Sequence, residues 1–469
     1  MRIEPKQLIV RYPLLKPKMM RKIKTYVIDL FCGAGGTSTA VFESGTNMEV
    51  IWCINHDATA IRSHTANYPN CVHATEDIRT FDLTELASKV AELRKDDPTC
   101  KIAIWASLEC TNFSKAKCGP KEADSRTLAI DMYRYIVLIQ PDFFWVENVE
   151  EFRDWGPLDI FGNPIKAQKG DDYKEWKGNL CNHFSDVHFD RTLISADYGG
   201  VTIRKRLFLQ FSLDPAMIGS PIQTHSKIKG NLKPWRAVKE VLELNNIGNS
   251  IFTRKKPFVP ATHRRILKGL KRYGPKKGTN FGIKYYGQDG HQDVKEPSAT
   301  LTTKDRISLV HVCIKQDFGT DTVKSLSSPM NTLTTRPKGD LVSVFMHNPQ
   351  YGGSNRSAYK PAATLIARQD KAPMGVTLCV PGDFNLTHDD EDDMFMKLIK
   401  DYCIEHSISD VLVRPLTIRE MLKIQGFPDW YKLTGTQTEQ KKHIGNSVEV
   451  KVGVALFEAI DNTIQKHTA

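Results

Sequence analysis

The chain has 469 residues, of which 40% are hydrophobic and 25% charged, an ordinary globular composition with enough apolar residues for two domains. Its net charge is +11, and no run approaches the roughly 18 apolar residues that a membrane span needs, so no membrane partner is expected. Ten cysteines occur without Cys-x-x-Cys or zinc-finger spacing. This argues against a metal site and a disulfide framework, and favours the reduced cytoplasm.

The first part of the chain alternates between two kinds of segment. Residues 1–24 are basic without a continuous apolar core, so we expect an N-terminal extension and not a signal peptide. Between residues 25 and 212, strands are expected at 26–31, 49–54, 102–106 and 143–146, and helices at 37–44, 58–66 and 127–139. The alternation predicts an α/β domain with a mostly parallel, Rossmann-like sheet covered by helices on both faces.

Residues 213–411 have a different composition, because Gly, Pro, Thr and Lys increase and long helices are expected to be scarce. Within this segment, residues 251–380 contain 22 Lys/Arg and 8 Asp/Glu, a local net charge of +14, so the rest of the chain sums to −3. We expect a smaller β-rich domain with a polyanionic partner. A solvated basic face without a partner is the alternative.

A repeat lies inside the basic segment. Residues 297–304 (PSATLTTK) recur at 329–336 (PMNTLTTR), and residues 361–368 (PAATLIAR) form a degenerate third copy. We interpret each copy as a β element with an exposed Thr/Lys/Arg rim that contacts nucleic acid through Lys304 and Arg336. Three strands that merely share turn chemistry are the alternative interpretation.

The α/β character is expected to return at residues 412–469. The acidic run 389–393 before it is typical of a solvated loop or a helix N-terminus. Thr417 is a candidate N-cap for a helix over 418–424, with Glu420 completing a capping box. The last helix is expected over 448–465. The basic segment is therefore inserted into, or attached to, a domain whose final piece comes late in the chain.

Three groups of residues carry the chemistry. After the first strand, Phe31 and the glycines Gly33, Gly35 and Gly36 form a turn into a helix, which suits a nucleoside-type cofactor but is weak evidence alone. Asn55, His56, Asp77 and Ile78 follow later strands, where ribose and adenine edges would be bound. For Asp77, a helix N-cap is an equally good interpretation.

Cys110 follows the strand at 102–106, and Glu147 ends the strand at 143–146. A cysteine and a glutamate at two strand ends are a candidate nucleophile and proton donor facing one pocket. Taken alone, a buried cysteine and a solvated glutamate are the simpler interpretation.

The order of these motifs resembles the DNA cytosine-5 methyltransferases. Phe31-x-Gly33-x-Gly35-Gly36 is followed by the Cys110 segment ending in Phe113-Ser114, then by Glu147-Asn148-Val149, Arg204-x-Arg206 and Gly445-Asn446-Ser447-Val448. The similarity covers roughly residues 25–212 and 412–460. The stretch between them corresponds to the family's variable target-recognition region.

The resemblance implies a role for each matching residue. Cys110 would attack carbon 6 of cytosine, Glu147 would protonate ring N3, and Arg204 and Arg206 would lie near the base carbonyl and the catalytic loop. The cofactor would be S-adenosylmethionine, held by the residues named above together with Asn446 and Val448. Ser114 would contact double-stranded DNA.

Four positions depart from the family pattern. Glu109 replaces the proline before the nucleophile, and a carboxylate there would raise the pKa of the thiol. Thr111 replaces a frequent glutamine, Asn55 replaces the acid expected at the ribose, and Thr202 replaces the glutamine before Arg204.

Three other functions remain open from the sequence. They are a tRNA cytosine-5 methyltransferase of the same fold, a catalytically inactive DNA-binding homologue, and a nucleotide enzyme with a coincidental glycine turn. The family further implies a monomer in the bacterial cytoplasm or nucleoid, and it allows a separately encoded restriction endonuclease as partner.

Overall fold

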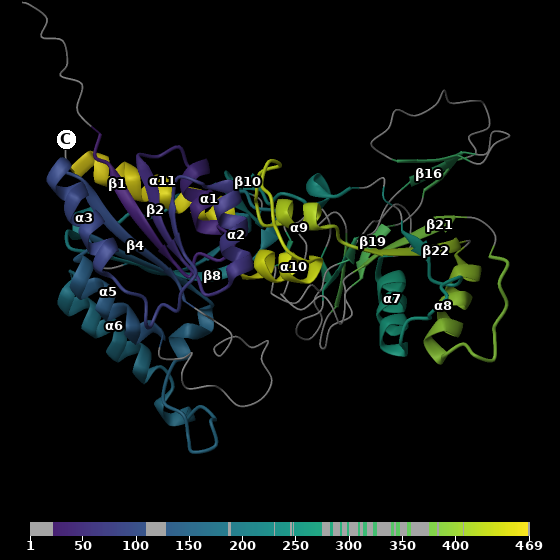
Figure 1. The fold of residues 1–469 in the computed structure, drawn as a ribbon. Helices are drawn as coiled ribbons and strands as arrows, with labels where there is room; N and C mark the ends of the chain where they lie inside the picture. Colours follow the sequence, from purple (N-terminus) through teal and green to yellow (C-terminus); the bar gives the residue numbers. More distant parts are fainter. Residues whose placement is uncertain are drawn as a thin grey trace, which may run out of the picture.

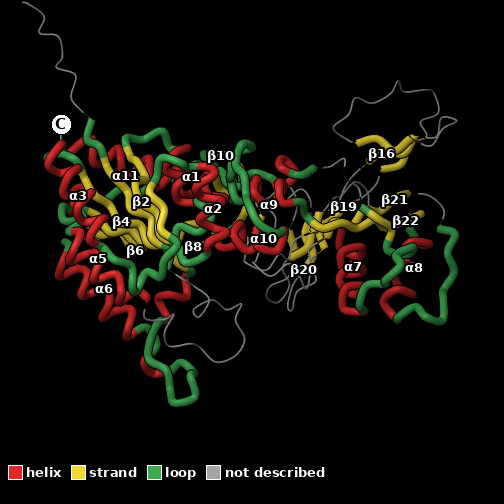
Figure 2. Tube along the Cα trace, in the orientation of Figure 1, coloured by secondary structure: helices red, strands yellow, loops and turns green. Residues whose placement is uncertain are grey.

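The computed structural model describes residues 22–108, 128–185, 189–228, 230–243, 246, 248–273, 384–406 and 408–467, together with the backbone of short strands between 282 and 381. Figure 1 shows these segments, and Figure 2 separates their helices, strands and loops. Within the described residues, no helix combines the length and the apolarity that crossing a membrane requires.

The first sheet has seven strands in the order β3-β2-β1-β4-β5-β8-β6. The strands are β1 (Thr25–Leu30), β2 (Met48–Ile54), β3 (Val72–Ala74), β4 (Lys101–Ser107), β5 (Phe143–Asn148), β6 (Phe189–Ile194) and β8 (Lys205–Ser212). β1 to β5 are mutually parallel, whereas β8 runs antiparallel to both β5 and β6. The predicted Rossmann-like, mostly parallel sheet is confirmed.

Helices cover both faces of this sheet, as predicted. They are α1 (Gly36–Glu43), α2 (Ala58–Asn67), α3 (Thr84–Asp96), α5 (Leu128–Ile139), α6 (Asp171–His183) and α11 (Val450–His467). Because side chains alternate along a strand, Trp105 and Trp145 pack with α1 and α11, whereas Ile104 and Phe144 pack with α3, α5 and α6. The apolar runs seen in the sequence are therefore strands buried on both faces.

The end of the chain returns to the first sheet. α11 lies beside α1, with the position of a Cβ on Gly453 only 2.6 Å from Ala40 Cβ (Figure 1). Asp461 Oδ2 of α11 accepts the backbone N–H of Asn47 at 3.3 Å, and Gln465 Nε2 donates to the carbonyl of Ile23 at 2.8 Å. The last helix therefore completes the domain that the first strand begins.

The remaining chain is rich in short strands. An eight-stranded sheet contains β11 (Asn249–Ser250), β12 (Gly282–Lys284), β13 (His291–Gln292), β15 (Ser308–Leu309), β19 (Val344–His347), β20 (Ser354–Ser357), β21 (Gly375–Pro381) and β22 (Ile408–Pro415). A three-stranded sheet contains β16 (Cys313–Gln316), β17 (Thr322–Ser325) and β18 (Gly339–Leu341). Short pairs are formed by β9 (His225–Ser226) with β10 (Lys233–Pro234) and by β7 (Thr202–Ile203) with β14 (Ser298–Ala299). β22 runs through the boundary expected after residue 411.

Two helices in this region differ from the expectation that long helices are scarce. α7 (Pro260–Tyr273) and α8 (Met394–Glu405) have 14 and 12 residues. α7 forms because Ile266, Leu267 and Leu270 lie on one buried face. At the start of α8, Asp393 accepts backbone N–H groups as its N-cap, so the acidic run ends at a helix N-terminus, one of its two predicted roles.

The chain leaves the second sheet through a buried ion pair. Arg414 of β22 and Glu420 of α9 (Ile418–Ile424) form two hydrogen bonds of 2.9 Å each, with side chains 5% and 0% exposed. Thr417 and Glu420 also form the predicted capping box, because Thr417 Oγ1 accepts the Glu420 N–H at 3.1 Å and Glu420 Oε2 accepts the Thr417 N–H at 2.8 Å. This junction anchors α9 and the following α10 (Gln437–Asn446).

Replacing Glu420 by glutamine should lower the free energy of unfolding by about 3–5 kcal/mol, because the guanidinium of Arg414 would stay buried without a counter-charge. Urea unfolding followed by circular dichroism measures the change. Asp429→Asn is the control, since the Asp429 carboxylate is 65% exposed and its ion pairs with Arg419, at 3.5 Å, and Lys423, at 3.0 Å, should contribute little. An unchanged unfolding free energy for Glu420→Gln would remove the pair from its anchoring role.

Candidate active site

The carboxyl ends of the parallel strands lie along one edge of the first sheet. Leu30 of β1 pairs with Ile54 of β2, and Ile54 pairs with Ala74 of β3. On the other side of β1, β4 ends at Ser107, which pairs with Glu147 of β5. The turn after β1 is thus two strands away from Glu147, roughly 10 Å at the usual spacing. The predicted cofactor turn and the predicted acid lie on the same edge.

The glycine turn after β1 has an unusual backbone. Phe31, Gly33 and Gly35 have φ angles of 60°, 53° and 98°, and the first of these is a left-handed conformation that non-glycine residues rarely adopt. Gly35 is the N-cap of α1 and donates its N–H to the carbonyl of Cys32 at 3.0 Å. Among the described residues, a Cβ on Gly33 would meet only the Phe31 carbonyl oxygen, at 4.0 Å. The backbone there is open to a ligand, in front of the amino end of α1.

The other two glycines permit close packing. A Cβ on Gly35 would lie 2.6 Å from Tyr431 Oη, and a Cβ on Gly36 would lie 2.2 Å from Ser447 Oγ and 2.7 Å from the Val448 carbonyl oxygen. The N-terminal glycine turn and the C-terminal Gly-Asn-Ser-Val turn are therefore in contact. Two predicted cofactor-binding segments, separated by about 400 residues of chain, form one structure.

Replacing Gly36 by alanine should weaken cofactor binding and lower stability by about 1–3 kcal/mol, because the new methyl group collides with backbone at Val448. Calorimetric titration with S-adenosylhomocysteine and thermal unfolding measure the two effects. Gly178→Ala in α6 is the matched control, since its Cβ would meet nothing within 4 Å. Equal cofactor affinity in both variants would show that the turn does not shape the site.

The strand-end residues after β2 are arranged as a turn. Asn55 Oδ1 accepts the N–H of Asp57 at 2.9 Å, and His56 is exposed. Asp57 is the N-cap of α2, and its Oδ2 lies 2.9 Å from Lys442 Nζ and 3.2 Å from His443 Nε2 of α10. These two contacts hold the pKa of the Asp57 carboxyl well below its usual range. Asp57 therefore joins this edge to the C-terminal segment, which the sequence analysis did not anticipate.

Asp77 and Ile78 lie beyond β3. Asp77 pairs with Arg79 at 2.6 Å, and the hydrogen bonds from Arg79 lower the pKa of this carboxyl to about 2. Asp77 does not cap α3, whose N-cap is Leu83, so that alternative is wrong. The Ile78 side chain is buried, and its carbonyl accepts the Tyr135 hydroxyl at 2.8 Å. Asp77 is thus ionised near neutral pH, and a ligand would share its two oxygens with the hydrogen bonds that Arg79 donates to them.

Glu147 is a buried carboxylate beside an arginine. Its side chain is 6% exposed, and its Oε1 lies 3.1 Å from Arg206 Nε of β8. The contact is an ion pair without the alignment of a hydrogen bond, since Oε1 has no hydrogen-bond partner among the described residues. A buried acid with an unused acceptor can engage a ring nitrogen and an amine of a ligand.

Arg204 is fully buried and joins the two parts of the domain. Its Nη1 donates to the carbonyl of Gly445 at 3.1 Å, and its backbone N–H donates to Thr202 Oγ1 at 3.3 Å. Thr202, one of the departures from the family pattern, thus still supports the Arg204 backbone. Of the two predicted arginines, the structure places Arg206 at Glu147 and Arg204 at the C-terminal turn.

Several predicted residues lie outside the described residues: Cys110, Ser114, Lys304 and Arg336, together with Glu109, Thr111 and nearly all of the repeat. Ser107, close to the end of the described residues before this segment, is the register partner of Glu147.

The C-terminal turn is held by a glutamine that the sequence analysis assigned no role. Gln425 is buried, and its Nε2 donates to the carbonyls of Ile444 and Ser447, each at 3.0 Å. Its own carbonyl accepts the Val450 N–H at 3.0 Å. Val448 is buried, whereas Asn446 is exposed and free to face a ligand. The signal was present in the sequence, because Gln425 belongs to the Gln-Gly-Phe-Pro stretch that resembles a family motif.

Glu449 beside this turn should make stability depend on pH. Complete burial raises the pKa of this carboxyl to about 7, above the value of about 4.3 in an unfolded chain. Between these values the unfolded state loses a proton that the folded state keeps, so stability should fall as pH rises from about 4.5 to 7. Glu449→Gln should flatten this slope, because it removes a loss of unfolding free energy that reaches up to about 3 kcal/mol at pH 7. Urea unfolding at several pH values measures the slope. Identical slopes for wild type and Glu449→Gln would contradict the raised pKa of Glu449.

The fold and this edge define the class of the protein: a Rossmann-like α/β protein with a glycine turn after the first strand, where proteins of this architecture bind nucleoside-type cofactors. The family model described as C-5 cytosine-specific DNA methylase matches residues 25–462. The chain therefore belongs to the family of DNA cytosine-5 methyltransferases, whose cofactor is S-adenosylmethionine.

Relatives span most of the chain or only part of it. The chain is 23% identical over 451 residues to the Type II methyltransferase M.SacI of Streptomyces achromogenes, covering 92% of each protein. It is 28% identical over 185 residues to M.DdeI of Desulfomicrobium norvegicum, covering 39% of each. A solved structure of a Spodoptera frugiperda DNMT2 mutant aligns with a TM-score of 0.48 and 12% identity, covering 93% of this chain and 99% of that one.

The described residues fit the cofactor of this family. The open backbone at Gly33 and the amino end of α1 can receive a charged or polar group. Asn55 and Asp77 at the neighbouring strand ends offer acceptors for hydroxyl and amine groups. Asn55 already accepts one local hydrogen bond, at 2.9 Å, which leaves the second lone pair of its oxygen for a ribose.

Proposed function

We propose that the protein methylates carbon 5 of a cytosine in a specific sequence of duplex DNA through a covalent adduct on Cys110. The observation that carries the proposal is the register of β4 with β5. This register pairs Glu147 with Ser107, which is three residues before Cys110 in the sequence. Arg206 Nε lies 3.1 Å from Oε1 of Glu147. A nucleophile and an acid can then act on opposite edges of one ring.

Carbon 5 of cytosine is a poor nucleophile, so the ring must be activated first. The thiolate of Cys110 forms a bond to carbon 6, and Glu147, which takes up a proton as the base binds, delivers it to N3 or donates a hydrogen bond there as charge develops. Arg206 stabilises the resulting carboxylate of Glu147. S-adenosylmethionine supplies an electrophilic methyl group on its sulfonium.

The remaining steps restore the aromatic ring. Carbon 5 takes the methyl group, and its proton then leaves to solvent or a base. The bond between carbon 6 and Cys110 breaks as the double bond re-forms, which returns the thiolate, and N3 gives its proton back to Glu147. Each turnover converts one methyl donor to S-adenosylhomocysteine and leaves Cys110 unchanged.

The base must leave the helix for these atoms to be reached. Flipping costs on the order of a few kcal/mol, which phosphate contacts of the basic segment 251–380 can offset. We assign residues 213–411 to target recognition, with Ser114, Lys304 and Arg336 contacting DNA. The N-terminal extension 1–24 and the catalytic pieces 25–212 and 412–469 complete the division. For Glu109, we propose that the carboxylate points away from the thiol.

The setting follows from the same family. We propose that the protein acts as a monomer in the bacterial cytoplasm or nucleoid, alongside a separately encoded restriction endonuclease. The relatives named Type II methyltransferases support the bacterial setting and the restriction partner. Size measurement of the purified chain tests the monomer.

Incubating the protein with S-adenosylmethionine labelled in its methyl group tests the substrate. Label should enter 5-methylcytosine in duplex DNA, and bisulfite sequencing should place it at one recurring sequence. Label appearing only in tRNA would replace DNA by RNA as the substrate. DNA binding without transfer to either nucleic acid would indicate the inactive homologue.

A further inference from the structure

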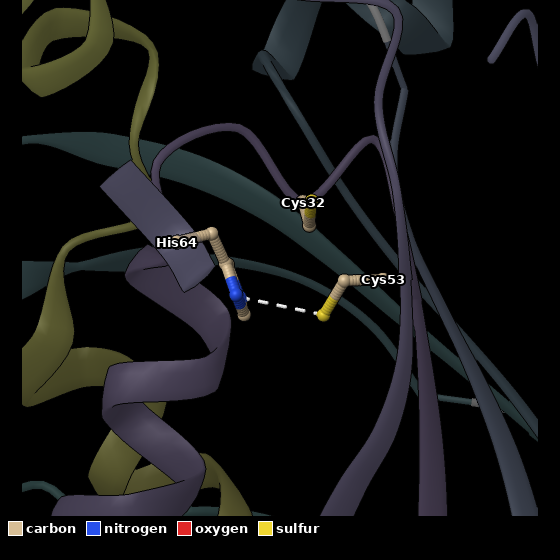
Figure 3. Close-up of side chains that lie close together, drawn as sticks. All are labelled: Cys32, Cys53 and His64. Carbon is tan, nitrogen blue, oxygen red and sulfur yellow. Dashed lines mark hydrogen bonds between the residues drawn. The ribbon is translucent and has the colours of Figure 1, made fainter. Parts of the chain in front are cut away.

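Four buried donor atoms from four different elements converge behind the glycine turn. Cys32 comes from the turn after β1, Ser38 from α1, Cys53 from β2 and His64 from α2. Their side chains are among the most deeply buried polar and sulfur groups of the chain, with residues at most 5% exposed. Figure 3 shows three of them, with His64 directed at the Cys53 sulfur and Cys32 on the adjoining loop.

The distances between the donor atoms lie on either side of those between ligands of a tetrahedral ion, so that small side-chain shifts would complete the geometry. The donor atoms of Cys32, Cys53 and His64 all lie within 4.8 Å of one another, and Cys53 Sγ lies 3.3 Å from His64 Nε2. Ser38 Oγ is 2.9 Å from His64 Nε2 and 3.9 Å from Cys53 Sγ. Zinc with bonds of about 2.3 Å to sulfur and 2.0 Å to nitrogen needs edges of about 3.5–3.8 Å.

We propose that Cys32, Cys53 and His64 bind a Zn²⁺ ion, with the hydroxyl of Ser38 at the fourth corner. Binding forms two metal–sulfur bonds and one metal–nitrogen bond, and it releases the two thiol protons to solvent. Two thiolates and a neutral imidazole balance the charge of the ion. The site is then electrically neutral, which removes the main cost of placing a dication in a buried position.

Outer contacts already orient the ligands. His64 Nδ1 lies 2.8 Å from His73 Nε2, so a proton on Nδ1 can be shared there while Nε2 faces the ion. Ser38 Oγ donates to Asp29 Oδ2 at 3.1 Å, which leaves its lone pairs for the metal. Cys71 Sγ donates to Cys53 Sγ at 3.3 Å and would stabilise the thiolate. Hydrogen bonds from neighbouring groups commonly orient the side chains that bind metals in proteins.

The expectation that no metal is bound rested on the absence of Cys-x-x-Cys and zinc-finger spacing. Ligands that come from distant parts of the chain cannot be recognised by such spacing. The three protein ligands are separated by 21 and 11 residues, and each belongs to a different element. An ion here would link the turn between Phe31 and Gly33 to β2 and α2. Phe31 and Gly33 both have left-handed φ angles. Its role is structural, because none of the ligands contacts Glu147 or follows β4 or β5.

Metal content of the full chain tests the proposal directly. The protein is stripped with a chelator, reloaded with Zn²⁺, desalted and analysed by mass spectrometry of the metal. Wild type should retain one more zinc ion per chain than Cys53→Ser. Cys100→Ser is the matched control, because this buried thiol donates to the Leu93 carbonyl, at 3.7 Å, lies outside the cluster, and should retain the wild-type content. Equal zinc in all three proteins, or none in wild type, would overturn the site.

Cobalt gives a second readout that does not depend on a variant folding. Co²⁺ in this site should produce a thiolate-to-cobalt charge-transfer band in the near ultraviolet and the visible bands of a tetrahedral ion. His64→Asn should weaken both, and Cys100→Ser should not. Absence of the charge-transfer band in the wild-type protein would contradict the proposal. Both readouts are independent of methyl transfer, so failure here leaves the proposed function intact.

Discussion

Replacing Cys110 by serine should lower the rate of methyl transfer to duplex DNA by on the order of 10⁴-fold or more, with little change in DNA affinity. A hydroxyl cannot supply an anion near neutral pH, whereas a few per cent of an ordinary thiol is ionised there and is strongly nucleophilic. Transfer of a labelled methyl group under single-turnover conditions measures the chemical step, and a gel-shift titration measures DNA binding.

Cys118→Ser is the matched control, since it changes a thiol only eight residues along the chain. It should retain methyl transfer. Turnover by Cys110→Ser within tenfold of wild type would remove the residue from its assigned role. Equal losses in both serine variants would indicate damage to the segment and not the loss of a nucleophile.

Replacing Glu147 by glutamine should lower kcat by about 10²–10⁴-fold, the usual contribution of a positioned acid. The amide keeps the shape of the side chain but cannot deliver a proton to N3, and it leaves Arg206, 3.1 Å away, without its counter-charge. KM for DNA should change much less than kcat. Single-turnover and steady-state methylation assays separate these effects.

Glu150→Gln is the comparison for this variant. Glu150 pairs with Lys205 at 2.7 Å two residues beyond β5, but both side chains are largely exposed, at 43% and 49%. Such a pair contributes little, so this variant should behave like wild type. A Glu147→Gln enzyme with normal kcat, or one whose loss lies wholly in KM, would show that the carboxyl binds DNA without acting as an acid.

Four strands of the first sheet, β1, β2, β4 and β5, could be predicted from the sequence because they contain apolar runs, whereas β3, β6 and β8 were not predicted. The strands that contain Trp105 and Trp145 are buried on both faces. A glycine turn follows β1, and Pro141 precedes β5. The order of the strands could not be predicted in the same way. The antiparallel position of β8 between β5 and β6 depends on packing over the whole sheet, which no local pattern encodes.

The second region was harder to predict. In α7 the apolar residues Ile266, Leu267 and Leu270 stand at helical spacing, but the basic residues around them resembled the solvated composition of the segment. The predicted site follows the motifs, since Glu147 and the glycine turn are placed by strand ends. Contacts between distant segments, such as Arg204 with Gly445 and Asp57 with His443, appear only once the chain is folded.

Covalent capture on duplex DNA containing 5-fluorocytosine tests the central claim most directly. Fluorine replaces the proton that must leave carbon 5, so the bond between the protein and carbon 6 should persist after methyl transfer. We predict that proteolysis and mass spectrometry will find the methylated base on Cys110, at a yield strongly reduced in Glu147→Gln. An adduct on another residue, or no adduct in a preparation that methylates ordinary DNA, would contradict the account.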